Sequence, residues 1–533
     1  MLKITFRIAG GLLLVLIIGL GLGYLRVGMR GVPLVSADPS IPLAEVDCGQ
    51  GLRGGRCGVV KAPLDYDAPS GEQIDIFFAY FPVRGVRPDR LLSLQLIGGG
   101  PGQPLFQSLR DVPMWIFQLR ALDHGMLIIE PRGLAPSADL TCPAVQDTPG
   151  KRTQEFGQTP NASVEKCAAE IGPRRIHCNT PNTARDFDRV RRALAIGRLD
   201  IAGFSYGTLL AAVYAGMFPK AVRTLAFNGS LPVAGWSFLN PDQHAAARRR
   251  FEQVCARSRQ CAGEEAWSAL GTVADSLRRA PRRVRAADGS GAEVIVTPAV
   301  LAGMIVPAPR PRSDDDPTLV DPIIGALLDG ARGNWSALEL LAARYFVTGT
   351  FERPNDEASA GPVFNQAVWL AVQCSEFAGM PWSPSDDIAT RQAKFDAALQ
   401  TVAPGRFAPF SVAEWAGRKN DMNYYDQCMH WPPSPGEPVR RPLTSYSDWA
   451  PDLPVLLLNG DYDMQTTHEL ARGAAEQFAS RPTWYARFEN FGHVIMPRSA
   501  CARGLWFELV RTRRVADPDV CHDDGGKMIV TRP

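Results

Sequence analysis

Short hydrophobic runs alternate with helix-like segments along most of this chain. Residues 56–60 and 74–83 predict two strands around a turn at 67–71. Further apolar runs of strand length lie at 91–97, 126–129, 199–202, 222–227, 455–458 and 483–488. Apolar residues at helical spacing predict a helix over 185–195, and a second apolar helix follows residue 205 to about residue 217. Because strands and helices alternate, we expect an α/β fold with a mostly parallel central sheet.

The strand pattern is interrupted between residues 235 and 445. This stretch is mainly helical in pattern, and we interpret it as an inserted cap. The basic run at 248–250 is expected to be a solvated helix face. The predicted organisation is an N-terminal segment 1–30, a linker 31–45, a first core part 46–234, a helical cap 235–445, and a second core part with a C-terminal disulfide region 446–533.

The N-terminal segment carries the longest apolar run. Residues 8–25 are almost unbroken Ile, Leu, Val, Gly and Ala, preceded by Lys3 and Arg7. The run approaches the ~20 residues that cross a hydrocarbon core. We therefore predict an uncleaved signal anchor, so that the membrane is a partner, with a cleaved signal peptide as the alternative. Basic residues flank the run on both sides, so they orient it only weakly.

Composition narrows the class of protein. The chain has 533 residues, 45% hydrophobic and 21% charged, which is ordinary globular usage. A net charge of +2 argues against a nucleic-acid partner. No phosphate-loop, dinucleotide-binding or zinc-protease motif is present, so we expect no cofactor and no metal. The pattern predicts no particular oligomeric state.

Eleven cysteines bear on the compartment. None forms a CxxC metal motif, and several come as close pairs separated by loop-like residues. In an exported chain this pattern indicates disulfides, so we expect the catalytic body outside the inner face of the membrane. The odd count leaves at least one cysteine unpaired, and Cys167 or Cys178 is the candidate.

The strand at 199–202 runs into Gly203-Phe204-Ser205-Tyr206-Gly207, which matches G-x-S-x-G. An apolar helix starts directly after Ser205. This strand–turn–helix context is that of the nucleophile elbow of α/β-hydrolases, in which a tight turn lifts the serine hydroxyl out of the sheet. We predict Ser205 as the nucleophile.

A serine needs a base, and in α/β-hydrolases the chain order is Ser, acid, His. Of the histidines after Ser205, we favour His493 as base, because it sits in a short loop after the 483–488 strand. The acid should follow the 455–458 strand, where Asp461 and Asp463 compete. Asp463 has the favoured spacing, and it would hold the imidazole tautomer and stabilise the imidazolium.

The oxyanion hole needs two N–H donors. The Gly-rich loop 98–102 closes the 91–97 strand, at the place where α/β-hydrolases put such a loop. We predict the backbone N–H groups of Gly100 and Tyr206 as the donors.

Taken together, these motifs resemble the tripeptidyl and prolyl aminopeptidase-like α/β-hydrolases, which are exported serine exopeptidases with a helical cap. The resemblance spans residues 48 to 521. It rests on segments that the family shares: Ala62-Pro63-Leu64-Asp65-Tyr66, Gly99-Gly100-Pro101-Gly102, Arg132-Gly133, Ala184-Arg185-Asp186, residues 203–208, Gly460/Asp463/Thr466, Gly492-His493, Cys374-Ser375-Glu376, Cys428, Trp431 and the Cys501/Cys521 spacing. The chain departs from the family at Glu130, Ala135, Gln103-Pro104, Asn228 and Thr467, and these altered loops border the expected substrate pocket.

The resemblance implies hydrolysis of short segments from the free N-terminus of a peptide. Glu376 is the candidate anion for the α-ammonium group, and the alternative is a glutamate that pairs with a cap arginine. Tentative disulfides are Cys48–Cys57, Cys255–Cys261, Cys374–Cys428 and Cys501–Cys521. Two other functions stay open: a carboxylic-ester hydrolase with the same triad, and a non-catalytic binding protein on a hydrolase scaffold.

Overall fold

The computed structural model describes most of the chain. The described residues are 34–49, 52, 55–81, 92–108, 124–145, 155, 159–234, 237–311, 319–349, 351, 364–376, 379–420, 423–433, 442–521 and 528–531. The predicted signal anchor and His522 lie outside these residues. Within them, none of the helices has the length and hydrophobicity needed to span a bilayer.

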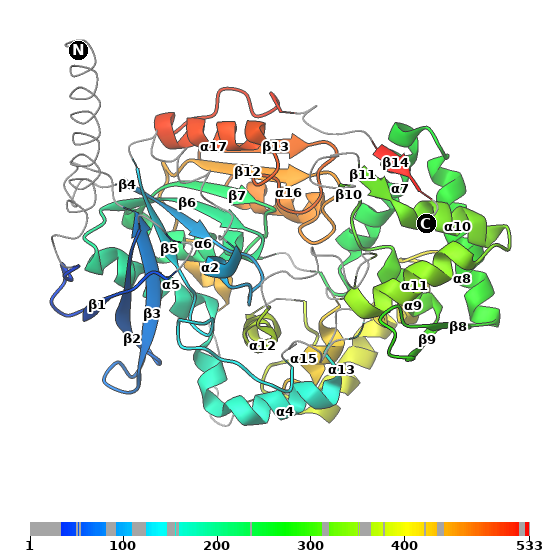
Figure 1. Ribbon diagram of the computed structural model, residues 1–533, viewed down its shortest axis with the longest axis horizontal. Helices are drawn as coiled ribbons and strands as arrows, with labels where there is room; N and C mark the ends of the chain where they lie inside the picture. Colours follow the sequence, from blue (N-terminus) through cyan, green and yellow to red (C-terminus); the bar gives the residue numbers. More distant parts are fainter. Residues whose placement is uncertain are drawn as a thin grey trace, which may run out of the picture.

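A nine-stranded sheet forms the centre of the described structure (Figure 1). Its order is β1-β2-β3-β5-β4-β6-β7-β12-β13. The first three strands are antiparallel, and the strands from β5 to β13 are parallel. The bounds are β1 Leu43–Val46, β2 Arg56–Pro63, β3 Gln73–Phe81, β4 Leu92–Ile97, β5 Gly125–Ile129, β6 Arg198–Phe204, β7 Val222–Asn228, β12 Val455–Gly460 and β13 Thr483–Phe488. The mostly parallel sheet predicted from the alternation is confirmed.

Helices cover both faces of the sheet. On one face α17 (Ala500–Thr512) packs against β7 and β12, and Trp506 and Leu458 belong to the same buried cluster. On the other face lie α5 (Thr180–Ala193), α6 (Tyr206–Met217) and α16 (His468–Gln477), and Phe187 and Leu457 share the larger cluster. Both faces of the parallel strands are therefore buried, which explains why those strands are hydrophobic without alternation.

The helix predicted over 185–195 starts five residues earlier than expected. The Asn179 side chain accepts a hydrogen bond from the Asn182 backbone N–H at 2.8 Å, and Pro181 stands in the first turn. An Asn cap followed by Pro is a strong start signal that the hydrophobic spacing alone does not carry.

Helices and short strands fill the chain between β7 and β12. They are α7 Pro241–Ser258, α8 Gly263–Arg279, β8 Arg282–Arg285, β9 Glu293–Val296, α9 Pro298–Met304, β10 Arg310–Pro311, β11 Leu319–Asp321, α10 Pro322–Ala331, α11 Ser336–Thr348, α12 Gln366–Glu376, α13 Ile388–Thr401, α14 Val412–Ala416 and α15 Tyr425–Met429. Among the described residues, the remaining α-helices and strands are α2 Leu105–Ser108, α4 Asn161–Ile171 and β14 Met528–Val530, and short 3-10 helices lie at Gly172–His177, Pro219–Ala221 and Leu443–Tyr446. β14 pairs in parallel with β11, so the C-terminal end of the chain joins a strand from the inserted region.

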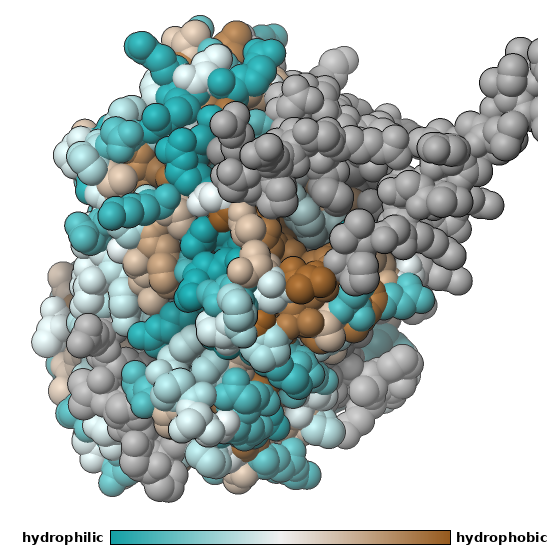
Figure 2. Space-filling view, turned by 90° about the vertical axis from the view of Figure 1, so that its left-hand side faces the viewer, coloured by the Kyte–Doolittle hydropathy of each residue, from teal (hydrophilic) through white to brown (hydrophobic). Residues whose placement is uncertain are grey.

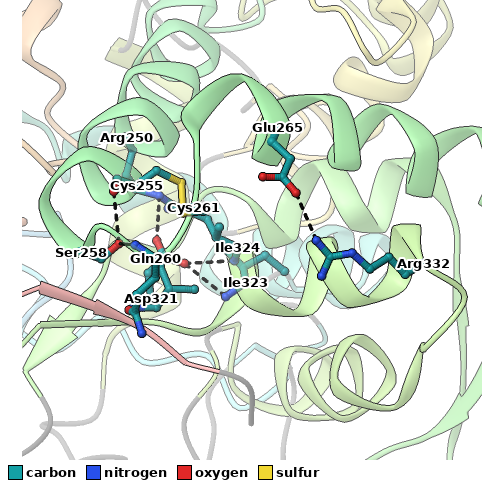
Figure 3. The surroundings of a disulfide bond; sticks show 11 residues. Arg250, Cys255, Ser258, Gln260, Cys261, Glu265, Asp321, Ile323, Ile324 and Arg332 are labelled. Atoms are coloured by element: carbon teal, nitrogen blue, oxygen red, sulfur yellow. Dashed lines mark hydrogen bonds and ion pairs between the residues drawn. A yellow bond between two sulfur atoms is a disulfide. The ribbon is translucent and has the colours of Figure 1, made fainter.

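The basic run in α7 is only partly the solvated face that we expected. Arg248 is exposed, but Arg250 is 1% exposed and lies 3.4 Å from Asp321, which also caps α10 through the N–H groups of Ile323 and Ile324 (Figure 3). A helix buried on one side turns every third or fourth residue inward, whatever its charge, and a buried arginine then needs a carboxylate partner.

All four tentative disulfides are present. They join Cys48 to Cys57, Cys255 to Cys261, Cys374 to Cys428 and Cys501 to Cys521. The Cys255–Cys261 bridge ties the C-terminal end of α7 to the start of α8 (Figure 3). Figure 2 views the molecule from the side of β1 to β3, where hydrophilic and hydrophobic residues are interspersed over the visible surface.

Candidate active site

Ser205 stands alone between the end of β6 and the start of α6. Its backbone has φ +55° and ψ −123°, a conformation that non-glycine residues rarely adopt. The flanking glycines are required by contact: a Cβ on Gly203 would lie 2.5 Å from the Gly207 carbonyl oxygen, and one on Gly207 would lie 2.3 Å from the Ile97 carbonyl oxygen. The G-x-S-x-G motif therefore forms the strained elbow that the sequence predicted.

Asp463 and His493 meet at the ends of β12 and β13. The imidazole Nδ1 lies 2.9 Å from Asp463 Oδ2. The same carboxylate accepts hydrogen bonds from the backbone N–H and hydroxyl groups of Thr466, at 2.7 and 2.6 Å, and from the Gln465 N–H at 3.0 Å. Asp463 is fully buried, whereas the His493 side chain is 21% exposed. The Asp463 carboxylate is thus held in one orientation by its hydrogen bonds, and the His493 imidazole is partly accessible to solvent.

Asp461, the competing acid, has different partners. Its carboxylate is bonded to Arg487, with Nη2 at 3.0 Å, and Arg257 lies 3.8 Å away. Two of the other histidines that follow Ser205 also have partners of their own: His430 bonds to Glu165 at 2.6 Å, and His468 bonds to Tyr485 at 2.7 Å. Of the two candidate acids, only Asp463 contacts His493.

Asn228 and Gly229 link the serine to the histidine. The Ser205 backbone N–H donates to the Asn228 carbonyl oxygen at 3.0 Å. The next residue, Gly229, faces the imidazole so closely that a Cβ there would lie 3.1 Å from His493 Cε1. The end of β7 therefore lies beside both the elbow and the imidazole, with one residue touching each.

The loop that carries His493 is itself held under strain. Val494 has φ +63°, which is an outlier for a β-branched residue. The following residue, Ile495, donates its N–H to Asn228 Oδ1 at 2.8 Å. Asn228 thus fixes the elbow through its backbone and the histidine loop through its side chain.

The glycine-rich loop after β4 lies directly over the elbow. A Cβ on Gly99 would lie 3.1 Å from Ser205 Cβ, and Gly100 follows with φ +111°. Tyr206 is the first residue of α6, so its N–H belongs to the helix terminus that has no intrahelical acceptor. Both predicted oxyanion donors therefore come from backbone adjoining the serine.

Glu130 holds the segment that directly follows this loop. Its carboxylate is fully buried and accepts hydrogen bonds from the N–H groups of Leu105 and Phe106, at 2.8 and 3.1 Å, just after the glycines. Burial raises the pKa of Glu130 to about 7, against the partial opposition of these two hydrogen bonds. Glu130, which departs from the family pattern, is therefore a buried carboxyl group that anchors the segment after the glycine-rich loop.

Glu376 lies at the C-terminal end of α12, half-buried, beside the start of α5. Its carboxylate accepts from the Thr180 N–H at 2.8 Å and from the Thr180 hydroxyl. That hydroxyl is also 2.7 Å from the Tyr206 hydroxyl. A carboxylate at a helix N-terminus is favoured by the helix dipole, so Glu376 joins the inserted region to the elbow side of the core.

Three positioning residues were not assigned roles from sequence. Asn228, Asn459 and Thr466 all follow or end a strand. Asn459 accepts from the Ser230 N–H at 3.2 Å and donates to the Thr466 carbonyl oxygen at 3.0 Å. Their place at strand ends was the available signal, but polar residues are common there. Within the part of the chain that the structure describes, no cluster of three His, Cys, Asp or Glu side chains could hold a metal.

Comparison with known proteins identifies the fold. Residues 96–260 match the model of the alpha/beta hydrolase fold, and residues 414–521 match that of the TAP-like proteins. The first match contains the Ser205 elbow, and the second contains Asp463 and His493. The chain therefore has the α/β-hydrolase fold, as the sequence predicted.

Two curated relatives make the resemblance more specific. A tripeptidyl aminopeptidase from Streptomyces lividans is 32% identical over 215 residues, 37% of this chain and 40% of that protein. The serine protease Hip1 from Mycobacterium bovis is 28% identical over 191 residues, 33% of this chain and 36% of that protein. The alignments span about 40% of the length of these relatives. The predicted resemblance is confirmed, and both names support an enzyme of the serine hydrolase class.

Proposed function

We propose that this chain is a serine aminopeptidase, which removes short segments from the free N-terminus of a peptide. The observation that carries the proposal is the convergence of Ser205, His493 and Asp463 around Asn228 and Gly229. Asp463 contacts His493, and Ser205 and His493 both adjoin the Asn228–Gly229 segment, which supports a triad in the chain order of α/β-hydrolases. The curated relatives named tripeptidyl aminopeptidase and serine protease support peptide as the substrate class.

In the proposed mechanism, His493 takes the proton of the Ser205 hydroxyl as the oxygen attacks the substrate carbonyl. Asp463 keeps Nδ1 protonated, so that Nε2 is the basic nitrogen, and stabilises the imidazolium. The N–H groups of Gly100 and Tyr206 stabilise the oxyanion. His493 then protonates the leaving amine, and water attacks the acyl-enzyme with His493 again as base.

The proposal is tested first at the serine. A fluorophosphonate should label Ser205 in the intact chain, and Ser205→Ala should abolish both labelling and turnover. A peptide library digested by the enzyme and read by mass spectrometry should lose residues only from free N-termini. Turnover of p-nitrophenyl esters without any peptide turnover would instead favour the ester hydrolase. A folded protein that resists labelling would favour a binding protein.

Glu376 is our candidate for the substrate's α-ammonium group. Its half-buried carboxylate is held by two Thr180 donors, and the Thr180 hydroxyl lies 2.7 Å from the hydroxyl of Tyr206, the residue next to Ser205. The competing explanation is purely structural, namely that Glu376 ties α12 to α5.

The two roles of Glu376 differ in their kinetics. If Glu376 binds the ammonium, Glu376→Gln should raise KM for free-amine peptides about tenfold or more and spare N-blocked esters. If it is a tie, both substrates should suffer equally. Thr180→Val is the matched control, because it removes one donor to the same carboxylate and leaves the charge in place.

We further propose that the enzyme acts outside the cytoplasm. Four disulfides among the described residues are typical of an oxidising compartment. Tethering through residues 8–25 is part of the same proposal, with the helices between β7 and β12 as the cap over the site. Alkaline extraction of membranes carrying the full chain tests the tether, because a cleaved signal would release the protein.

A further inference from the structure

Three cysteines lie outside the four disulfides. All eleven cysteines of the chain are among the described residues, and Cys142, Cys167 and Cys178 are the ones left as thiols. Each is buried, with exposed fractions of 1%, 0% and 5%. These three thiols allow at most one further disulfide, which would leave one thiol unpaired.

Geometry selects one pair from the three possibilities. The Cys142 thiol donates to Glu170 Oε2 at 3.3 Å, and Glu170 lies about one helical turn after Cys167 on α4. Cys142 therefore lies against the face of α4 that carries Cys167, and both side chains belong to the same buried cluster. Cys178 lies elsewhere, with its sulfur 3.6 Å from the Arg132 carbonyl oxygen and against Gly133.

We propose that Cys142 and Cys167 form a fifth disulfide, and that Cys178 is the odd cysteine of the chain. The oxidant is a disulfide donor, protein or small molecule, of the kind that the other four bridges also require. One Cys142–Cys167 sulfur–sulfur bond forms, the donor's sulfur–sulfur bond breaks, and the two thiol protons pass to the donor's sulfurs.

The bond forms before the fold closes. Burial raises the pKa of both thiols, so neither is a reactive thiolate once it is enclosed. During folding the same two cysteines are solvated and free to exchange with the donor. After folding, the bridge is shielded from reductants as well.

The bridge would brace the wall of the site. Cys142 belongs to the loop that follows β5, and Cys167 lies on α4. Helix α4 contacts α15, where Asn161 Nδ2 lies 3.1 Å from Asp426 Oδ1. The Cys374–Cys428 disulfide continues from α15 to α12, the helix that carries Glu376. Two bridges in series would thus connect the core loop to the helix at the substrate end.

The test counts the free thiols of the full chain after it has been exported and oxidised. The intact chain is denatured in guanidinium with N-ethylmaleimide and no reductant, and its mass is measured. One adduct is expected, and a digest should yield a Cys142–Cys167 linked peptide pair that disappears on reduction. Linked peptides from the other four bridges in the same digest show that the sample is oxidised. Three adducts, or a linked pair that contains Cys178, would overturn the proposal.

Matched serine variants give a second measurement. Cys178→Ser should carry no adduct, whereas Cys142→Ser should carry two. Cys142→Ser, Cys167→Ser and the double variant should lower the unfolding temperature by the same amount, because each removes one shared bond. Independent, additive shifts would contradict a bond between the two sulfurs.

Discussion

The position of Gly229 yields a sharp test of the triad that leaves every triad residue intact. Gly229 has φ +75°, and a Cβ added there would lie 2.9 Å from Thr466 Oγ1, 3.1 Å from His493 Cε1 and 3.3 Å from Nδ1. Ordinary contacts with carbon are about 3.5 Å. In Gly229→Ala, the hydroxyl or the imidazole must therefore move by roughly half an ångström.

The matched control is Gly289→Ala. Gly289 has the same φ of +75°, but a Cβ there would have no neighbour within 4 Å. Both variants carry the strain of a left-handed alanine, about 1–2 kcal/mol. Only Gly229→Ala adds overpacking, about 1–3 kcal/mol. The difference between the two variants thus isolates the contact with the triad from the backbone strain.

The assay is the rate at which a fluorophosphonate labels Ser205, measured beside thermal unfolding. Since a misplacement of about 1 Å costs roughly a hundredfold in rate, we expect Gly229→Ala to lose about ten- to a hundredfold. Gly289→Ala should label at the wild-type rate. A folded Gly229→Ala protein that labels within twofold of wild type would refute the placement of the imidazole against Gly229.

Three further predictions concern carboxylates and the histidine loop. Asp463→Asn should lower kcat about 10⁴-fold, whereas Asp461→Asn should lower stability and keep most of the activity. Steady-state kinetics of the two variants decide which aspartate is the catalytic acid, and equal losses of kcat would contradict the assignment of Asp463. Because the folded pKa of Glu130 is about 7 against 4.5 unfolded, the folded state holds the extra proton between these values, and stability should fall by about 3 kcal/mol as pH rises from 4.5 to 7. Urea unfolding of Glu130→Gln should show that slope removed, and an unchanged slope would rule out this carboxyl. Asn228→Ala leaves the buried Ile495 N–H without its acceptor. Unfolding measurements should therefore show a loss of stability of about 1–3 kcal/mol, and kcat should fall. An unaltered kcat would show that this hydrogen bond does not position the histidine.

The chain determines its local elements by itself. The strand at 483–488 and the start of α6 at Tyr206 follow from hydrophobic period and turn chemistry, both of which act over a few residues. The nucleophile elbow is recognisable from its local motif, and Gly203 is required by the nearby Gly207 backbone, whereas Gly207 is required by Ile97 at the end of strand β4. Chain order, together with its place in a short loop after the 483–488 strand, then nominated His493.

Long-range contacts decided the rest. Asp461 and Asp463 both follow β12, and spacing favoured Asp463, but their partners were set by β13 and the loop after it, which give one aspartate Arg487 and the other His493. Arg250 is a surface residue by its composition, but packing of α7 turned it toward Asp321.

The same holds for pairs that the sequence could not connect. The placement of Cys142 against helix α4, and the pairing of β14 with β11, depend on how helices and loops far apart in the chain come together. Periodicity records whether a side chain is buried, but it carries no information on which other side chain it will meet. Partner identity therefore came from the tertiary structure.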